Sequence, residues 1–161
     1  MPMFPDFKEL LSALNEHNVR YLVVGGYAVS HHAQPRATKD LDIFVSPDPA
    51  NAIAVFSALA RFGAPLEGMR PTDFTDISNF FRMGTPPMMV DILPHIAGVD
   101  FEDAWTRRVS VGVDDKLSVP FIARTDLLAA KVAAGRPQDL ADVAAIEATQ
   151  AAADTAGEKN S

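Results

Sequence analysis

Three aspartates are the residues of this 161-residue chain whose type and spacing could do chemistry. Asp40 and Asp42 lie two positions apart in the segment DLDIFV, which alternates polar and apolar residues as a strand does. Side chains at i and i+2 of a strand share a face, so the two carboxylates would repel each other by roughly 3 kcal/mol at about 6 Å and an effective dielectric of 20. A divalent cation between them would turn this repulsion into attraction. Oxygen ligands on a rigid strand suit Mg²⁺, with Mn²⁺ as an alternative.

Asp91 supplies a third carboxylate from the segment MMVDIL, which also has the composition of a strand. An acid inside such an apolar run calls for a partner, although one acid in a strand is often simply exposed on its polar side. An Asp-x-Asp pair is likewise common on solvated faces and in helix caps. Taken together, the three acids favour a metal site made by Asp40, Asp42 and Asp91.

Gly25 and Gly26 follow the compact apolar run RYLVV, at the turn from a predicted strand to a predicted helix. Glycine lets the backbone approach a ligand closely, and the free amides at the start of a helix favour anions. An ordinary turn would use the same residues. Amides for phosphate oxygens, beside carboxylates for the metal that bridges them, are the equipment of phosphoryl or nucleotidyl transfer.

The segment VVGGYAVSHHAQPRATKDLDIFV resembles the signature of the polymerase-beta-like nucleotidyltransferase superfamily, in which an apolar residue and Gly-Gly or Gly-Ser precede an Asp-x-Asp pair. More narrowly, GGYAV followed by RATKDLD resembles the AbiEii-type nucleotidyltransferases of type IV toxin–antitoxin systems. Aminoglycoside and lincosamide adenylyltransferases share a similar arrangement. The later segment KVAAGRPQDLADV is similar to a Lys … Arg-x-x-Asp-x-x-Asp segment of the AbiEii-like group.

The resemblance implies roles for the matching residues. Gly25 and Gly26 would face the triphosphate, and Asp40 and Asp42 would bind Mg²⁺. Asp91 would complete the metal site or activate the attacking hydroxyl.

Three residues between the glycines and the acids would belong to the nucleotide site. Arg36 and Lys39 could neutralise phosphate charge, or could be solvated loop cations. Thr38 could orient the loop or contact phosphate.

Lys131 shares the apolar face of a predicted helix over 126–134, and we assign it to the nucleotide site together with Asp139. Asp139 and Asp142 would lie on one side of the following helix. A pair between Lys131 and either aspartate could close against the carboxylate site, and the spacing leaves the choice open. Lys131 could instead extend its ammonium to solvent, and Asp139 could favour the helix dipole.

The elements that must position these residues follow from hydrophobic periodicity and from turn residues. One domain is expected over 1–149, with a disordered tail over 150–161 that has no periodicity. The fold class is α/β (α+β), and the resemblance implies a nucleotidyltransferase fold: a short mixed β-sheet backed by helices, with the C-terminal helices packed on it. The predicted elements are a helix over 5–17, strands over 20–24 and 40–45 with a helix over 27–33 between them, a helix over 49–62, strands over 79–82, 88–93, 107–113 and 117–122, a helix ending near 134, and a last helix starting at 137.

Composition excludes several classes of protein. The chain has no cysteine, which excludes disulfides and thiolate sites, and its formal net charge of −7 argues against stable binding of duplex nucleic acid. The N-terminus lacks a secretory pattern, and the longest near-apolar run, 21–29, is too short to cross a bilayer. We expect a cytoplasmic protein with no membrane contact.

The sequence therefore predicts a Mg²⁺-dependent nucleotidyltransferase that binds a nucleoside triphosphate, moves the nucleoside monophosphate to a hydroxyl and releases pyrophosphate. The acceptor could be a tRNA end, a protein hydroxyl or a small molecule. The resemblance adds a toxin–antitoxin component with a partner regulator protein. Two alternatives remain open: a non-catalytic binding module, acting as an antitoxin or nucleotide sensor, and a phosphohydrolase using the same carboxylates.

Overall fold

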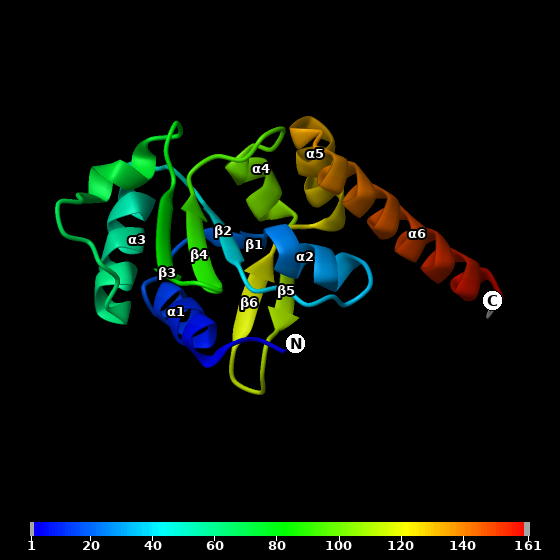
Figure 1. Cartoon of the computed structure of the whole chain (residues 1–161), viewed down its shortest axis with the longest axis horizontal. Helices are drawn as coiled ribbons and strands as arrows, with labels where there is room; N and C mark the ends of the chain where they lie inside the picture. The colour runs from blue at the N-terminus through cyan, green and yellow to red at the C-terminus, as the bar shows by residue number, and fades with distance from the viewer. Residues whose placement is uncertain (1, 160–161) are drawn as a thin grey trace.

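A computed structural model describes residues 2–159 and contains one six-stranded mixed sheet in the order β3-β4-β2-β1-β6-β5 (Figure 1). β1 pairs antiparallel with β2 and parallel with β6, while β2 pairs parallel with β4. Two antiparallel hairpins, β3–β4 and β5–β6, form the two edges. The strands are β1 Tyr21–Val24, β2 Leu41–Val45, β3 Phe81–Thr85, β4 Met88–Leu93, β5 Val109–Gly112 and β6 Ser118–Phe121.

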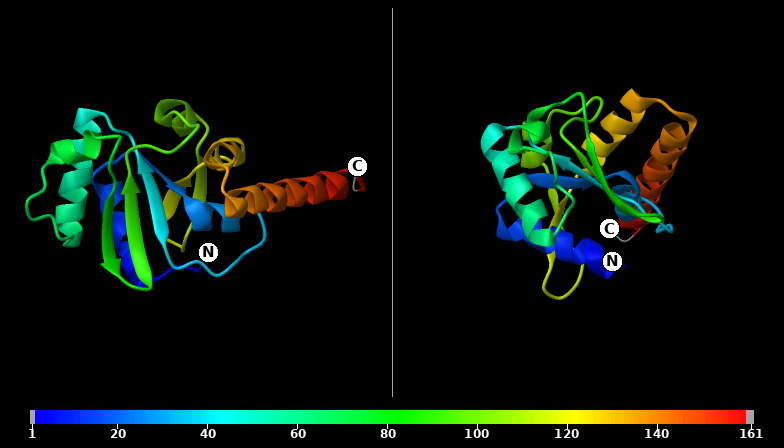
Figure 2. Two further views of the ribbon diagram at one scale, coloured as in Figure 1. Left: turned by 45° about the horizontal axis from the view of Figure 1, so that its top comes forward. Right: turned by 60° about the vertical axis from the view of Figure 1, so that its left-hand side comes forward.

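Helices surround this sheet, which confirms the predicted α+β class of a mixed sheet backed by helices. α1 packs against α3, whereas α5 and α6 pack against each other and against α2. The α3 helix and the α5–α6 pair lie on opposite sides of the molecule (Figure 2). The helices are α1 Pro5–Glu16, α2 Gly25–His32, α3 Pro49–Phe62, α4 Phe101–Thr106, α5 Arg124–Ala134 and α6 Pro137–Lys159, with a 3₁₀ helix, η1, over Pro71–Thr75.

The core forms where the sequence is most apolar. Every residue of β1 is buried, as expected of a central strand with a continuous apolar run. The predicted stripe of α1 is buried as well, and it consists of Phe7, Leu10, Leu11 and Leu14. Across residues 2–159, none of the helices has the length and hydrophobicity that a bilayer crossing requires.

The β3 strand begins and ends later than the predicted 79–82, because the chain pairs through Gly84, which the sequence places in the connecting turn. Gly84 has a φ of +119°, and a Cβ there would overlap the carbonyl oxygen of Met88 on the neighbouring strand. Only glycine leaves room for this pairing.

The α6 helix continues to Lys159, whereas the sequence predicts disorder from residue 150. Residues 151–157 of this helix are exposed, and the helix extends away from the sheet there (Figure 1). Alanine, the strongest helix former, is frequent there, and intrinsic propensity can form a helix without an apolar face. Residues 160–161 of the predicted tail lie outside the described part of the chain.

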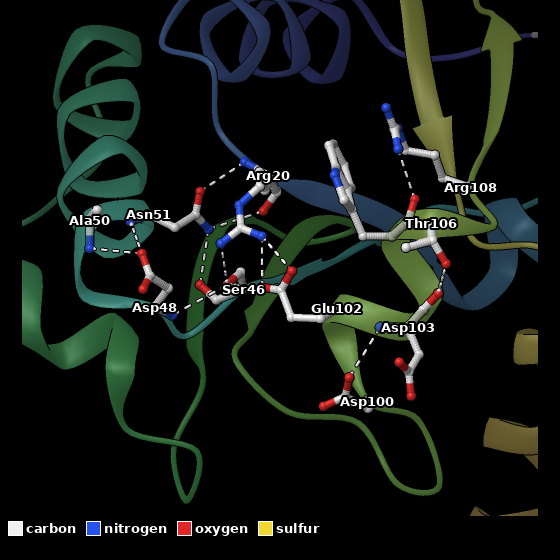
Figure 3. A network of polar contacts seen from close by, with 11 residues as sticks. Arg20, Ser46, Asp48, Ala50, Asn51, Asp100, Glu102, Asp103, Thr106 and Arg108 are labelled. Carbon is white, nitrogen blue, oxygen red and sulfur yellow. Dashed lines mark hydrogen bonds and ion pairs between the residues drawn. The ribbon is translucent and has the colours of Figure 1, made fainter.

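Polar side chains join α3 and α4 to one end of the β1–β2 pair (Figure 3). The Arg20 guanidinium lies 2.6 and 2.7 Å from the Glu102 carboxylate and donates to Ser46 Oγ at 3.2 Å. The buried Asn51 side chain accepts from the Arg20 amide and donates to the carbonyls of Arg20 and Ser46. These groups satisfy one another and fix this end of the sheet.

Candidate active site

The opposite end of the β1–β2 pair carries the predicted carboxylates. Asp42 in β2 and Asp91 in β4 are direct partners in the parallel register. Asp40 lies immediately before β2, with its side chain 50% exposed, whereas the Asp91 side chain is 17% exposed. The sheet thus brings together two acids that are 49 positions apart in sequence, with the third at the more open edge.

Burial and the neighbouring carboxylates Asp91 and Asp40 raise the pKa of Asp42 from its ordinary 3.8 to about 6, against a smaller lowering by Lys131. Asp91 Oδ1 is buried without a hydrogen-bond partner among the described residues. A buried carboxylate oxygen in this state is costly unless a cation or a proton satisfies it.

These two carboxylates fit a hard divalent cation, since they offer only oxygen ligands and their mutual repulsion falls when a cation binds. Within residues 2–159, no group of three or more acidic or histidine side chains is already gathered as an ion site. We therefore assign Asp42 and Asp91 as the pair that would hold the cation, with substrate oxygens and water completing its shell and Asp40 next to it.

Gly25 begins α2 directly after β1, two residues earlier than the predicted helix over 27–33. It has a φ of +64°, and a Cβ at this position would overlap the Asp42 carboxylate. A Cβ at Gly26 would lie 2.5 Å from Thr38 Oγ1. Among the described residues, no side chain caps the start of α2, so its first amides remain available to an anion.

Gly25→Ala is expected to destabilise the protein by at least about 2 kcal/mol and to impair the carboxylate site, because left-handed strain adds to the overlap with Asp42. Gly68→Ala is a matched control, since Gly68 has a φ of +76° and no atom within 4 Å of the added Cβ. The control should lose only about 1 kcal/mol. Urea unfolding of both variants checks the difference; equal losses would contradict the close approach of Gly25 to Asp42.

The loop between α2 and β2, residues 33–40, forms one wall of an open cleft of about 620 Å³. Arg36, Thr38 and Lys39, predicted for the nucleotide, all line it. Thr38 lies against Gly26, whereas Arg36 Nη1 donates to Asp142 Oδ1 at 2.8 Å. Arg36 thus already has a carboxylate partner and ties the loop to α6. The full lining is Gly26, Arg36, Ala37, Thr38, Lys39, Asp40, Asp42, Pro87 and Gln138.

Lys131 on α5 forms ion pairs with both Asp139 and Asp142 on α6. Its Nζ lies 3.3 Å from Asp139 Oδ1 and 3.1 Å from Asp142 Oδ2. Asp139 and Asp142 are 1% and 2% exposed. Hydrogen bonds, first of all from Arg136, lower the pKa of Asp139. For Asp142, burial raises the pKa, but the bonds from Lys131, Gln138 and Arg36 outweigh it and the net direction is down. Asp139 is thus buried between two cations, Lys131 and Arg136.

Sequence reasoning missed three residues at this site. Arg82 lies opposite Asp91 in the β3–β4 register, with Nε 3.7 Å from Asp91 Oδ1 and Nη2 3.8 Å from Asp40 Oδ2. Arg136 pairs with Asp139, and Gln138 with Asp142. The position of Arg82 depends on the register of the β3–β4 hairpin, and the positions of Arg136 and Gln138 depend on the turn between α5 and α6. Composition therefore does not predict that these residues lie at the site. Only the Arg of the segment RPQDLAD, which is Arg136, could have been found from its spacing to the two aspartates.

The raised pKa of Asp42 predicts that the metal-free protein loses stability as pH rises. A group whose folded pKa lies above its unfolded value stabilises the fold below the unfolded pKa, and this contribution is lost as pH rises to and through about 6. The loss attributable to Asp42 is about 2 kcal/mol between pH 4 and pH 7.5.

Urea unfolding in EDTA across this range checks the sign, with Asp42→Asn as the reference. Burial lowers the pKa values of His31 and His32, so the free energy of unfolding that these groups contribute increases as pH rises. The wild-type minus variant difference removes their contribution. A difference that does not change with pH would contradict the electrostatics of Asp42.

Comparison with known families adds one finding. A protein-family model described as "Nucleotidyltransferase of unknown function (DUF6036)" matches residues 3–151. This range includes the three candidate carboxylates, the two glycines at the start of α2, and Lys131 with its two aspartate partners. No curated protein sequence matches the chain.

Proposed function

This chain belongs to that family of nucleotidyltransferases, and from this premise we propose that it transfers a nucleoside monophosphate from a nucleoside triphosphate to a hydroxyl. The observation that carries the proposal is that Asp42, the register partner of Asp91, and Gly26, in the first turn of α2, line one open cleft. The cleft thus offers carboxylate oxygens to a cation and backbone amides to phosphate oxygens.

The proposed reaction follows from these positions. The acceptor oxygen forms a bond to the α-phosphorus, the bond from that phosphorus to the bridging oxygen breaks, and pyrophosphate leaves with the electron pair. The hydroxyl proton goes to Asp91 or to water. The first amides of α2 bind phosphate oxygens, and Lys39 offsets their charge. Mg²⁺, held by Asp42 and Asp91 next to Asp40, would supply electrostatic stabilisation of charge on the phosphates.

The experiment combines binding and turnover. Calorimetry with ATP should show binding that depends on Mg²⁺, and Mg²⁺ alone should raise the unfolding free energy of the wild type at pH 7.5 but not that of Asp42→Asn. With α-labelled nucleotide and candidate acceptors, label should enter the acceptor and pyrophosphate should appear. Metal-independent binding without turnover would contradict the proposal, and release of orthophosphate would identify a phosphohydrolase.

A second candidate, a nucleotide-binding module without turnover, is favoured by Arg82. Its guanidinium lies near both Asp40 and Asp91 and offsets part of the charge that a cation would otherwise offset. Both distances exceed hydrogen-bond range, and the Arg82 side chain is 49% exposed, so solvent screens these pairs. The charge left on the partly buried Asp42–Asp91 pair favours the enzyme.

The proposal has a narrower form that rests on the AbiEii-type resemblance. In that form the chain is a component of a toxin–antitoxin pair and binds a partner regulator protein. Among acceptors, the net charge of −7 favours a small molecule or a protein hydroxyl over an extended polyanion, while a single tRNA end needs little contact.

A further inference from the structure

A second cleft, of about 800 Å³, shares a wall with the carboxylate cleft. The loop residues 36–39 line both clefts, so one segment of chain separates them. The other walls of the second cleft come from the N-terminal residues 2–4 and from α2. Its volume falls in the range of small-molecule sites, about 300–1,000 Å³.

The lining of this cleft is mostly apolar with a few polar points. Phe4, 37% exposed, and Pro35 contribute apolar surface. Ser30 and His31 contribute polar groups from α2, and the Ser30 hydroxyl already bonds the Arg36 carbonyl at 3.2 Å. Apolar walls with few convergent polar groups bind an apolar molecule and orient it.

Tyr27 gives the cleft a specific polar contact. Only 3% of Tyr27 is exposed, yet its hydroxyl makes no hydrogen bond to any residue in 2–159. The hydroxyl of Tyr21, by contrast, donates to Asn15. Burial raises the pKa of Tyr27, so the hydroxyl keeps its proton at neutral pH. Among residues 2–159 the Tyr27 hydroxyl is not one of the fully enclosed polar atoms that lack a partner, so water or a ligand in the cleft can reach it. A ligand hydroxyl in the cleft would supply a hydrogen-bond partner.

We propose that this second cleft binds the acceptor, and that the acceptor is a small molecule with an apolar body and a hydroxyl group. This inference rests on the proposed function. Its chemical content is that the apolar walls hold the body, the Tyr27 hydroxyl bonds a polar group of the ligand, and the shared loop places the ligand beside the phosphates. The transfer step is the one given above, with the acceptor oxygen bonding to the α-phosphorus and pyrophosphate leaving.

The test uses 2-naphthol as the probe and the ¹⁵N-labelled full chain. Amide resonances within 27–39 should shift saturably. Tyr27→Phe should weaken binding roughly fivefold, as loss of one hydrogen bond predicts, and Ser30→Trp, which fills the cleft, should weaken it at least about tenfold. Ile53→Trp is the matched control, because Ile53 is 58% exposed on α3. It should leave binding unchanged.

Simultaneous occupancy distinguishes acceptor from nucleobase. Saturating Mg²⁺ with a non-hydrolysable α,β-methylene ATP should change the 2-naphthol affinity less than twofold; displacement of the probe by nucleotide would overturn the inference, because the base would then occupy the cleft. No saturable shift, or equal binding by Tyr27→Phe, Ser30→Trp and the wild type, would overturn it as well. Asp42→Asn should keep 2-naphthol binding and lose the Mg²⁺–nucleotide response. If the wild type binds 2-naphthol but no nucleotide, the proposed function is refuted. The conclusion that the second cleft binds small apolar molecules with a hydroxyl group is then retained.

Discussion

Replacing Asp42 by asparagine is expected to lower the rate of nucleotidyl transfer on the order of a thousandfold without loss of the fold. The variant removes one of the two partly buried carboxylates that would hold the cation, and electrostatic groups of this kind contribute about 10² to 10³ in rate. The fold should gain stability at pH 7.5, because burial and the neighbouring acids disfavour ionised Asp42. Label transfer and urea unfolding measure the two effects together.

Asp115→Asn provides the control for this variant. Asp115 is exposed in the β5–β6 connection, so the substitution makes the same chemical change far from the carboxylates in sequence and should alter neither rate nor stability. Retained transfer by Asp42→Asn would refute the assignment of the site. A large loss of stability in metal-free buffer would contradict the repulsion between Asp42 and its neighbours.

Lys131→Met is expected to destabilise the protein by about 3 kcal/mol, the largest structural effect that we predict. The substitution removes a cation that lies 3.3 Å from Asp139 and 3.1 Å from Asp142, both almost completely buried. Without Lys131, the buried Asp142 Oδ2 loses the ammonium at 3.1 Å, and the two aspartates keep only Arg136, Arg36 and Gln138 as partners. Removal of one member of a buried ion-pair network is strongly destabilising. The variant should also raise the pKa of Asp42 further, because Lys131 lowers it.

Urea unfolding at pH 7.5 measures this effect, with Lys116→Met as an exposed control that should change stability by less than about 0.5 kcal/mol. Adding Asp142→Asn to Lys131→Met should recover part of the loss, since the carboxylate that has lost its ammonium partner is then replaced by a neutral amide. A Lys131→Met variant as stable as the wild type would show that Arg36 and Arg136 alone neutralise the two aspartates.

Local patterns predicted the elements well where periodicity or end signals were strong. The helix over 49–62 was confirmed to the residue, because Pro49 starts it, Asp48 caps it and Gly63 ends it in the left-handed conformation. The β3 strand was misplaced, because glycine in a strand and glycine in a turn look alike in sequence. The end of α6 was missed, because an alanine-rich segment without an apolar face carries no periodicity signal.

The sequence alone indicates candidate residues for chemistry, since an Asp-x-Asp pair after Gly-Gly is a local pattern that needs no tertiary structure to be recognised. Two predicted nucleotide ligands have different surroundings in the structure: Asp139 is buried between Lys131 and Arg136, and Arg36 bonds Asp142. Spacing along one helix cannot tell which way a buried charge is compensated.

Residue type and local order thus determined which acids and glycines could form a site, because strand alternation and turn chemistry act over a few neighbouring residues. Tertiary structure alone decided that Asp91 pairs with Asp42, that Arg82 lies across from Asp91, and that Lys131 bridges two helices. Those outcomes depend on strand order and register, which the burial of the whole apolar surface selects at once and no single segment encodes.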